Sequence, residues 1–117
     1  MNVPARSFRD LVVWQKAHEF VLRTYDHTKQ FPREELYCLV PQMRRAAISI
    51  LANIAEGFKK RGLADKNRFF DTSRGSLEES RYYLILGEDL GYGQCTALEP
   101  LLGDVSRPLI AYAQAVT

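Results

Sequence analysis

Apolar residues recur three or four positions apart over four separate stretches of the chain, which is the spacing of a helix. We expect helices over about 8–30, 41–61, 66–90 and 97–115. In the first, one arc of the helix carries the apolar side chains Leu11, Val13, Trp14, Ala17, Phe20, Val21, Leu22 and Tyr25. That arc spans roughly 200°, whereas an ordinary surface helix has an apolar stripe of about 100°. A single neighbouring helix would not cover so wide an arc.

The second and third predicted helices carry narrower apolar faces. In 41–61 the face consists of Met43, Ala46, Ala47, Ile50, Ile54 and Phe58. In 66–90, large and small residues each recur at intervals of seven along one seam, namely Phe70, Leu77 and Leu84 with Ser73, Ser80 and Gly87. Alternating large and small side chains allow helices to approach closely, so we expect this seam in the core of a bundle.

Capping residues, glycine and proline set the expected helix ends. Capping-box patterns over 7–10 and 96–99 precede the first and last helices. Phe31-Pro32 should end the first helix, because the residue before a proline is disfavoured in the α region. Gly62 follows three cations and should end the second helix, and Asp65 is the expected N-cap of the third. Pro108 is expected to kink or break the last helix.

The composition is that of one folded domain. The 117 residues are 46% hydrophobic and 26% charged, which suits a single domain over 1–117. Four helices joined by short turns, without a strand pattern, predict an all-α, antiparallel up-down-up-down four-helix bundle. No apolar run approaches the roughly 18 residues of a membrane span. Two isolated cysteines, Cys38 and Cys95, fit a reducing cytoplasm, and we expect both to be buried.

No pattern in the chain indicates catalysis, a cofactor or a metal. A Gly-rich phosphate loop, a His-Glu-x-x-His motif and paired cysteines at zinc spacing are all missing from the sequence. His18 and His27 lack the Glu three residues earlier that di-iron bundles require. We therefore expect a protein that is not an enzyme.

The net charge of +2 is unevenly distributed. Residues 42–81 carry nine Lys and Arg against five Asp and Glu, so this stretch is +4 and the remainder is −2. The candidate nucleic-acid-binding residues are Lys59, Lys60 and Arg61, then Lys66 and Arg68 across the turn, and Arg45 on the polar face of 41–61. Two alternatives stay open for the three consecutive cations. They stabilise the negative end of the dipole of their own helix, or they contact a protein.

Arg44 lies on the flank of the apolar face of its helix. Burying a guanidinium without a partner is costly, so we expect a carboxylate beside it. That acid could belong to another helix or to a neighbouring subunit.

The segment Asn53–Gly57 is a second candidate structural or subunit-interface motif. Gly57 inside a helix costs roughly 1 kcal/mol against Ala, which indicates close approach by another backbone. Asn53 and Glu56 could bridge by hydrogen bonds to a neighbouring helix or subunit. Packing within the chain, a subunit interface and nucleic-acid contact remain open for this motif, and Trp14 joins the interface candidates.

Several motifs together resemble one known family. They are Phe8–Ala17, Phe31-Pro32-x-x-Glu35-x-Tyr37, Gln42–Ala47 with Ser49-Ile50, Asn53–Gly57, Gly75-Ser76-Leu77-x-Glu79 and Leu90-Gly91-Tyr92. These segments are similar to the bacterial four helix bundle protein family, first described as encoded in intervening sequences of 23S ribosomal RNA genes. The similarity covers about residues 8–92.

This resemblance implies a four-helix bundle that assembles into a ring-shaped homopentamer. The family's role is largely undefined, and an association with ribosomal RNA is inferred from gene location. A related accessory protein of diversity-generating retroelements forms a basic barrel that binds a reverse transcriptase and nucleic acid. Our leading hypothesis is a non-enzymatic, self-assembling bundle that contacts RNA or a ribonucleoprotein. The alternative is a structural oligomeric adaptor that recruits a protein such as a reverse transcriptase.

Overall fold

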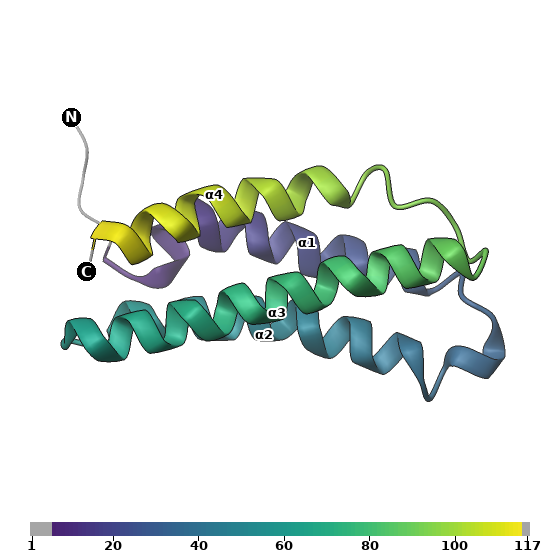
Figure 1. Ribbon diagram of the computed structural model, residues 1–117, viewed down its shortest axis with the longest axis horizontal. Helices are drawn as coiled ribbons and strands as arrows, with labels where there is room; N and C mark the ends of the chain where they lie inside the picture. Colours follow the sequence, from purple (N-terminus) through teal and green to yellow (C-terminus); the bar gives the residue numbers. More distant parts are fainter. Residues whose placement is uncertain (1–5, 116–117) are drawn as a thin grey trace.

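Four antiparallel α-helices make up most of the computed structural model, which describes residues 6–115. In chain order they are α1 (Val12–Thr28), α2 (Leu39–Lys59), α3 (Leu63–Asp89) and α4 (Glu99–Ala115). Each helix runs opposite to the one before it, and α4 packs back against α1 (Figure 1). No strand occurs within 6–115. The predicted all-α, up-down-up-down bundle is confirmed.

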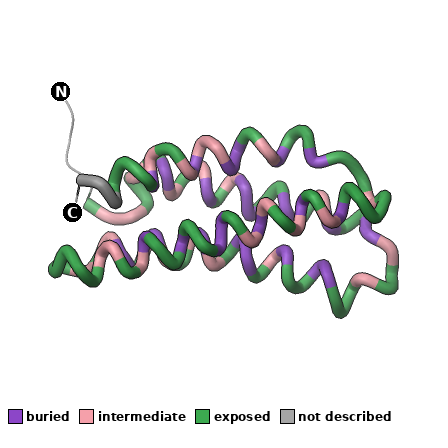
Figure 2. Tube along the Cα trace, viewed as in Figure 1, coloured by how far each residue is buried: buried purple, intermediate pink, exposed green. Residues whose placement is uncertain are grey.

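The core runs between the four helices, where the buried positions face one another (Figure 2). All six members of the expected α3 seam are buried, and so are all members of the expected α2 face except Phe58, which is half-buried. The helix α1 contributes Val13, Ala17, Phe20 and Val21, and α4 contributes Leu101, Leu102, Val105 and Leu109. The spacing of apolar residues was therefore sufficient to predict which side of α2 and α3 faces the core.

The apolar arc of α1 is only partly covered by the bundle. Leu22 remains 54% exposed and Tyr25 36% exposed, and Trp14 is half-buried. These side chains lie on the side of α1 that its neighbours leave open. As the width of the arc predicted, one bundle does not bury all of it.

The N-terminal helix is shorter than expected. The capping box of Ser7 and Asp10 is present, but it closes a single 3-10 turn, η1 (Phe8–Asp10). The Asp10 carboxylate accepts the backbone N–H of Ser7 at 3.2 Å. Leu11 is then extended, with ψ of 129°, and α1 begins only at Val12. The expectation of one helix over 8–30 was wrong, because an extended residue separates the capped turn from α1.

The second helix begins two residues before Pro41 and ends at Lys59. The Glu35 carboxylate accepts the N–H of Leu39 at 3.3 Å and so caps the first turn of α2. Pro41 is tolerated there because the first turn needs no N–H donor from it. At the other end Lys60 leaves the helical region, with ψ of 141°. The expected bounds 41–61 are thus displaced by two residues at each end.

The third and fourth helices also differ from expectation at their ends. Gly62 is the N-cap of α3, so Asp65 lies in the first turn instead of capping it. The fourth helix begins at Glu99 and continues through Pro108 without a break. A proline in a helix interior costs about 3 kcal/mol, and burial of α4 residues such as Val105 and Leu109 offsets that cost.

The two cysteines have different environments. Cys95 is 6% exposed, as expected, and burial raises the pKa of its thiol. Cys38 is exposed just before α2, so the expectation that both are buried was wrong. Within the described range no helix has both the length and the apolar character needed to cross a membrane.

Candidate nucleic-acid interface

The basic residues near the α2–α3 turn form the candidate interface, and three of them follow one another in the chain. Lys59 is the last residue of α2, and Lys60 and Arg61 form the connection to α3. Lys59 and Arg61 are exposed and Lys60 is half-buried. None of the three makes an ion pair with the residues that the structure describes, so their charges remain available to a ligand.

Lys66 has a structural role at the end of α2. Its Nζ donates to the carbonyl oxygens of Gly57 at 3.2 Å and Phe58 at 2.8 Å. Both carbonyls lie in the last turn of α2, at the negative end of its dipole, and the Gly57 oxygen also accepts the N–H of Lys60 at 3.2 Å. The positive charge of Lys66, which lies on α3, therefore stabilises the negative end of the α2 dipole.

Arg68 contacts an aromatic ring next to the cations of the α2–α3 turn. We call Lys59, Lys60, Arg61, Lys66 and Arg68 the basic cluster. Its guanidinium is 3.5 Å from Asp65, in a pair that is exposed to solvent. It also lies 5.1 Å from the centre of the Phe69 ring, and Lys60 Nζ lies 5.1 Å from the same ring. Phe69 was missed by the sequence reasoning, although it directly follows Arg68 in a basic segment.

Arg45 does not belong to this cluster. It lies about 20 Å from Lys59 along α2, taking roughly 1.5 Å per residue. Its guanidinium is 2.6 Å from the carboxylate of Glu79, which also accepts a hydrogen bond from Tyr83 at 2.9 Å. The hydrogen bond and charge of Glu79 raise the pKa of Arg45. Arg45 thus joins α2 to α3.

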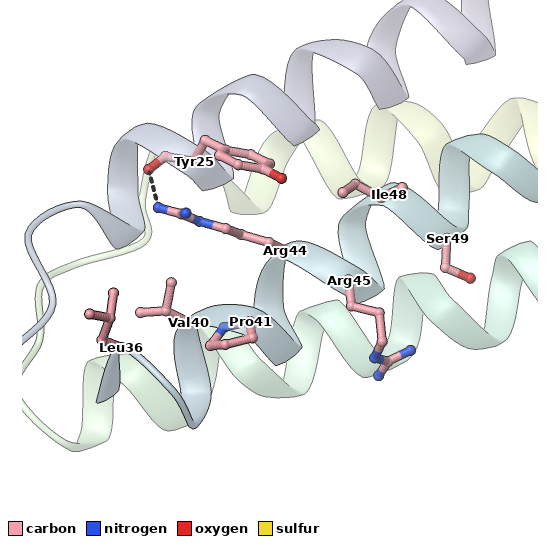
Figure 3. A pocket seen from close by; sticks show the side chains of 8 residues that line it. All are labelled: Tyr25, Leu36, Val40, Pro41, Arg44, Arg45, Ile48 and Ser49. Atoms are coloured by element: carbon pink, nitrogen blue, oxygen red, sulfur yellow. Dashed lines mark hydrogen bonds between the residues drawn. The ribbon is translucent and has the colours of Figure 1, made fainter. Parts of the chain in front are cut away.

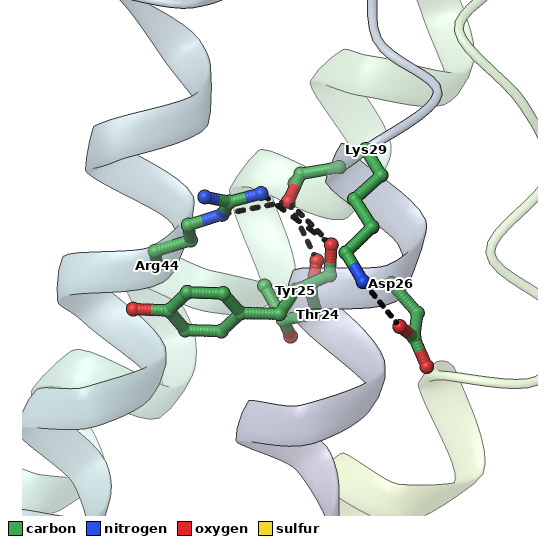
Figure 4. A network of polar contacts seen from close by, with 6 residues as sticks. Thr24, Tyr25, Asp26, Lys29 and Arg44 are labelled. Carbon is green, nitrogen blue, oxygen red and sulfur yellow. Dashed lines mark hydrogen bonds and ion pairs between the residues drawn. The ribbon is translucent and has the colours of Figure 1, made fainter.

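Arg44 is held between α1 and α2 by neutral groups (Figure 4). Its Nε donates to Thr28 Oγ1 at 2.9 Å, and its Nη2 lies 3.5 Å from the carbonyl oxygen of Tyr25. The guanidinium also stacks 4.4 Å from the centre of the Tyr25 ring. Within 6–115 it forms no ion pair, so the expectation of a carboxylate partner in the chain was wrong. The aromatic face and the hydroxyl solvate the charge instead.

The Asn53–Gly57 segment makes its contacts inside the chain. Asn53 Nδ2 donates to the carbonyl oxygen of Ser49 at 2.8 Å, within α2, so among the described residues it does not bridge directly to another helix. Its role at a subunit interface stays a prediction. Gly57 is approached by a side chain, because a Cβ placed there would lie 2.7 Å from the Phe70 ring. The expected close approach is present, but its source is an aromatic ring and not a backbone. Glu56 is exposed, and its interface role stays a prediction.

Trp14 packs in an aromatic group at the start of α1. Its ring stacks on His18, with 5.3 Å between ring centres and 14° between planes, and lies 5.3 Å from Phe8. These contacts place it at the edge of the core. Its proposed interface role also stays a prediction. No group of three or more His, Cys, Asp or Glu able to hold a metal ion occurs among the described residues.

The fold and these surfaces define a class of protein, an all-α four-helix bundle with a basic cluster at one end. The chain belongs to the 23S rRNA-intervening sequence protein family, which matches residues 9–108. It is also similar to a crystal structure of a protein with unknown function from the S23 ribosomal protein family of Bacteroides thetaiotaomicron VPI-5482. The TM-score is 0.77 at 22% identity, over 88% of this chain and 96% of that one. At that identity the likeness concerns the fold. No curated protein matches the chain.

Proposed function

We propose that this protein is a non-enzymatic, self-assembling helical bundle that contacts RNA through Lys59, Lys60 and Arg61. The observation that carries the proposal is that these consecutive cations have no acidic partner among the described residues. Neutralising phosphates with such cations releases counterions from RNA, which drives binding. Membership of a family named for 23S rRNA intervening sequences supports RNA as the partner.

The half-buried ring of Phe69 supports single-stranded RNA over a duplex. Lys60 and Arg68 flank this ring, each at 5.1 Å. Unpaired bases stack on aromatic side chains while neighbouring cations hold the phosphates. A duplex keeps its bases stacked inside and would not use the ring.

Self-assembly would multiply the basic cluster. In the ring of five that the family resemblance implies, each copy contributes the same three cations. Several weak contacts to one RNA then act together, since the later ones form within a complex that already exists. The incompletely covered apolar arc of α1, with Leu22 at 54% exposure, supports association of copies.

RNA contact can be measured by fluorescence anisotropy with an unstructured, labelled RNA at a series of salt concentrations. In the variant Lys59→Gln/Lys60→Gln/Arg61→Gln we expect affinity to fall roughly tenfold or more at low salt. The slope of log K against log salt should decrease by about 2, taking about 0.7 for each lost phosphate contact.

The matched control is Arg23→Gln/Lys29→Gln/Arg33→Gln, which removes the same charge near the opposite end of the bundle. We expect it to change the affinity and the slope little. An equal loss in both variants would contradict a local site. No binding of wild-type protein even at low salt would refute RNA contact and favour the protein-recruiting adaptor.

Assembly is tested separately by light-scattering mass after size-exclusion chromatography. A mass of about five protomers of 13.4 kDa is expected. A clean species of one protomer would refute self-assembly.

A further inference from the structure

An open groove runs between the end of α1 and the start of α2, at the opposite end of the bundle from the basic cluster. Its volume is about 580 Å³, and its walls are mainly apolar. Figure 3 shows Tyr25 on one side of Arg44 and Leu36, Val40 and Pro41 on the other, with Ile48 farther along α2. Three of these side chains are substantially exposed: Leu36 at 48%, Ile48 at 43% and Tyr25 at 36%. The bundle itself leaves this apolar surface uncovered.

Arg44 places a fixed positive charge in the groove. Its Nε and Nη2 are oriented by Thr28 and Tyr25, and the ring of Tyr25 lies against the guanidinium. Nη1 makes no hydrogen bond with a described residue, and the nearest partners are all neutral. A preorganised guanidinium between apolar walls fits a carboxylate that is flanked by apolar side chains.

A surface with that chemistry lies on α3 of the same chain. Glu78, Tyr82, Ile85 and Asp89 follow one another at spacings of four, three and four residues, so they share one stripe of the helix. The stripe points away from the buried seam of α3. Tyr82 is 56% exposed and Ile85 47% exposed, with a carboxylate on each side of the pair. We call these four residues the α3 stripe.

Asp89 is the better of the two carboxylates for Arg44. Glu78 is already 3.4 Å from Arg81, whereas Asp89 is exposed and forms no ion pair within 6–115. Asp89 is also the last residue of α3, at the negative end of the helix dipole, where a carboxylate is disfavoured. A guanidinium brought next to it would relieve that repulsion.

We propose that the α3 stripe of one copy docks into the α1–α2 groove of the next copy, with Asp89 against Arg44. The proposal rests on the self-assembly proposed above and is independent of RNA contact. The groove and the stripe lie on different helices, so each copy can use both at once. Such a head-to-tail contact closes into a ring when the rotation between copies allows it.

Charge reversal tests this pairing in the full-length chain. Asp89→Arg should weaken association roughly a hundredfold, because it places like charges together in a desolvated contact. Ile85→Asp should weaken it as well. The double variant Arg44→Glu/Asp89→Arg should restore association, since the pair is then reversed. Light-scattering mass over a dilution series at equal protomer concentration reports each variant.

Two controls keep the outcomes distinct. Asp104→Arg makes the same charge change on α4 and should leave the mass unchanged. Far-UV circular dichroism checks that each variant is folded, and Asp89 and Ile85 are exposed, so their replacement should not affect the fold.

A monomeric wild type would overturn self-assembly itself. An assembling wild type whose mass is unaffected by Asp89→Arg and Ile85→Asp would overturn only the assignment of these surfaces. The assignment would also be overturned if Arg44→Glu lost RNA affinity while its mass stayed unchanged, because the groove would then be an RNA-binding surface.

Discussion

Gly57→Ala is the substitution whose effect the structure defines most closely. A Cβ at this position would lie 2.7 Å and 2.9 Å from two ring carbons of Phe70, and 3.2 Å from Cβ of Phe69. Phe70 is itself 6% exposed and packs in the core, so its ring cannot move into solvent. Phe69 Cβ is fixed by the α3 backbone. The new methyl group must therefore displace α3 or strain the ring.

Two opposing effects set the size of the change. Alanine is favoured over glycine in a helix interior by roughly 1 kcal/mol. Forcing a methyl group into a filled core costs typically 1–3 kcal/mol. Because two contacts are shorter than 3 Å, we take the upper half of that range. The expected result is a free energy of unfolding lower by about 1 to 2 kcal/mol.

Gly75→Ala is the matched control. Gly75 also lies inside a helix, α3, but a Cβ there meets nothing within 4 Å. This variant should gain roughly 0.5–1 kcal/mol, the helix-propensity effect alone. Urea unfolding at equal protomer concentration, followed by circular dichroism, gives both values. If Gly57→Ala is as stable as wild type or more stable, the steric argument is wrong.

Three further predictions concern single polar groups. Ser73→Ala should lower the free energy of unfolding by about 1 kcal/mol, because Ser73 Oγ donates to the carbonyl oxygen of Ile50 at 2.8 Å in the core. Ser80→Ala should be neutral or stabilising, since its buried hydroxyl has no partner among the described residues; urea unfolding compares the two, and a larger loss at Ser80 would contradict this. The hydrogen bond to Glu35 raises the pKa of Tyr92 from 10.0 to about 12. The folded state favours the neutral phenol, so its contribution is complete below pH 10 and is lost as the pH rises toward 12. Unfolding measured across that interval should depend less on pH in Tyr92→Phe, and an unchanged dependence would rule out this contribution.

Much of the helical core was predictable because its signal is periodic. The α3 seam repeats every seven residues, so its members share one face of the helix, and that whole face turns toward the core together. The helix ends were less predictable, since they depend on single contacts. The Glu35 carboxylate starts α2 at Leu39, and the extended Leu11 separates η1 from α1. Neither effect has a periodic signature.

The candidate sites were predictable only as far as neighbours in the chain determine them. The cations at the α2–α3 turn are adjacent in sequence, but the contact of Lys66 with the end of α2 depends on how two helices meet. For Arg44, the argument from desolvation correctly required a partner. It assumed a carboxylate, whereas an aromatic face with a hydroxyl and a carbonyl oxygen serves the same purpose. Those partners come from α1, far away in the sequence.

The short connection between α2 and α3 has a consequence for how the chain folds during its synthesis. These two helices share the most extensive contact in the bundle, and only residues 60–62 separate them. Contacts between segments that are near in sequence form fastest, so the α2–α3 hairpin can form as soon as both helices have left the ribosome. The helix α1 must wait for α4, its other neighbour, which is made last of the four. Until then part of its apolar arc has no cover, and the nascent chain is most prone to aggregation in that interval.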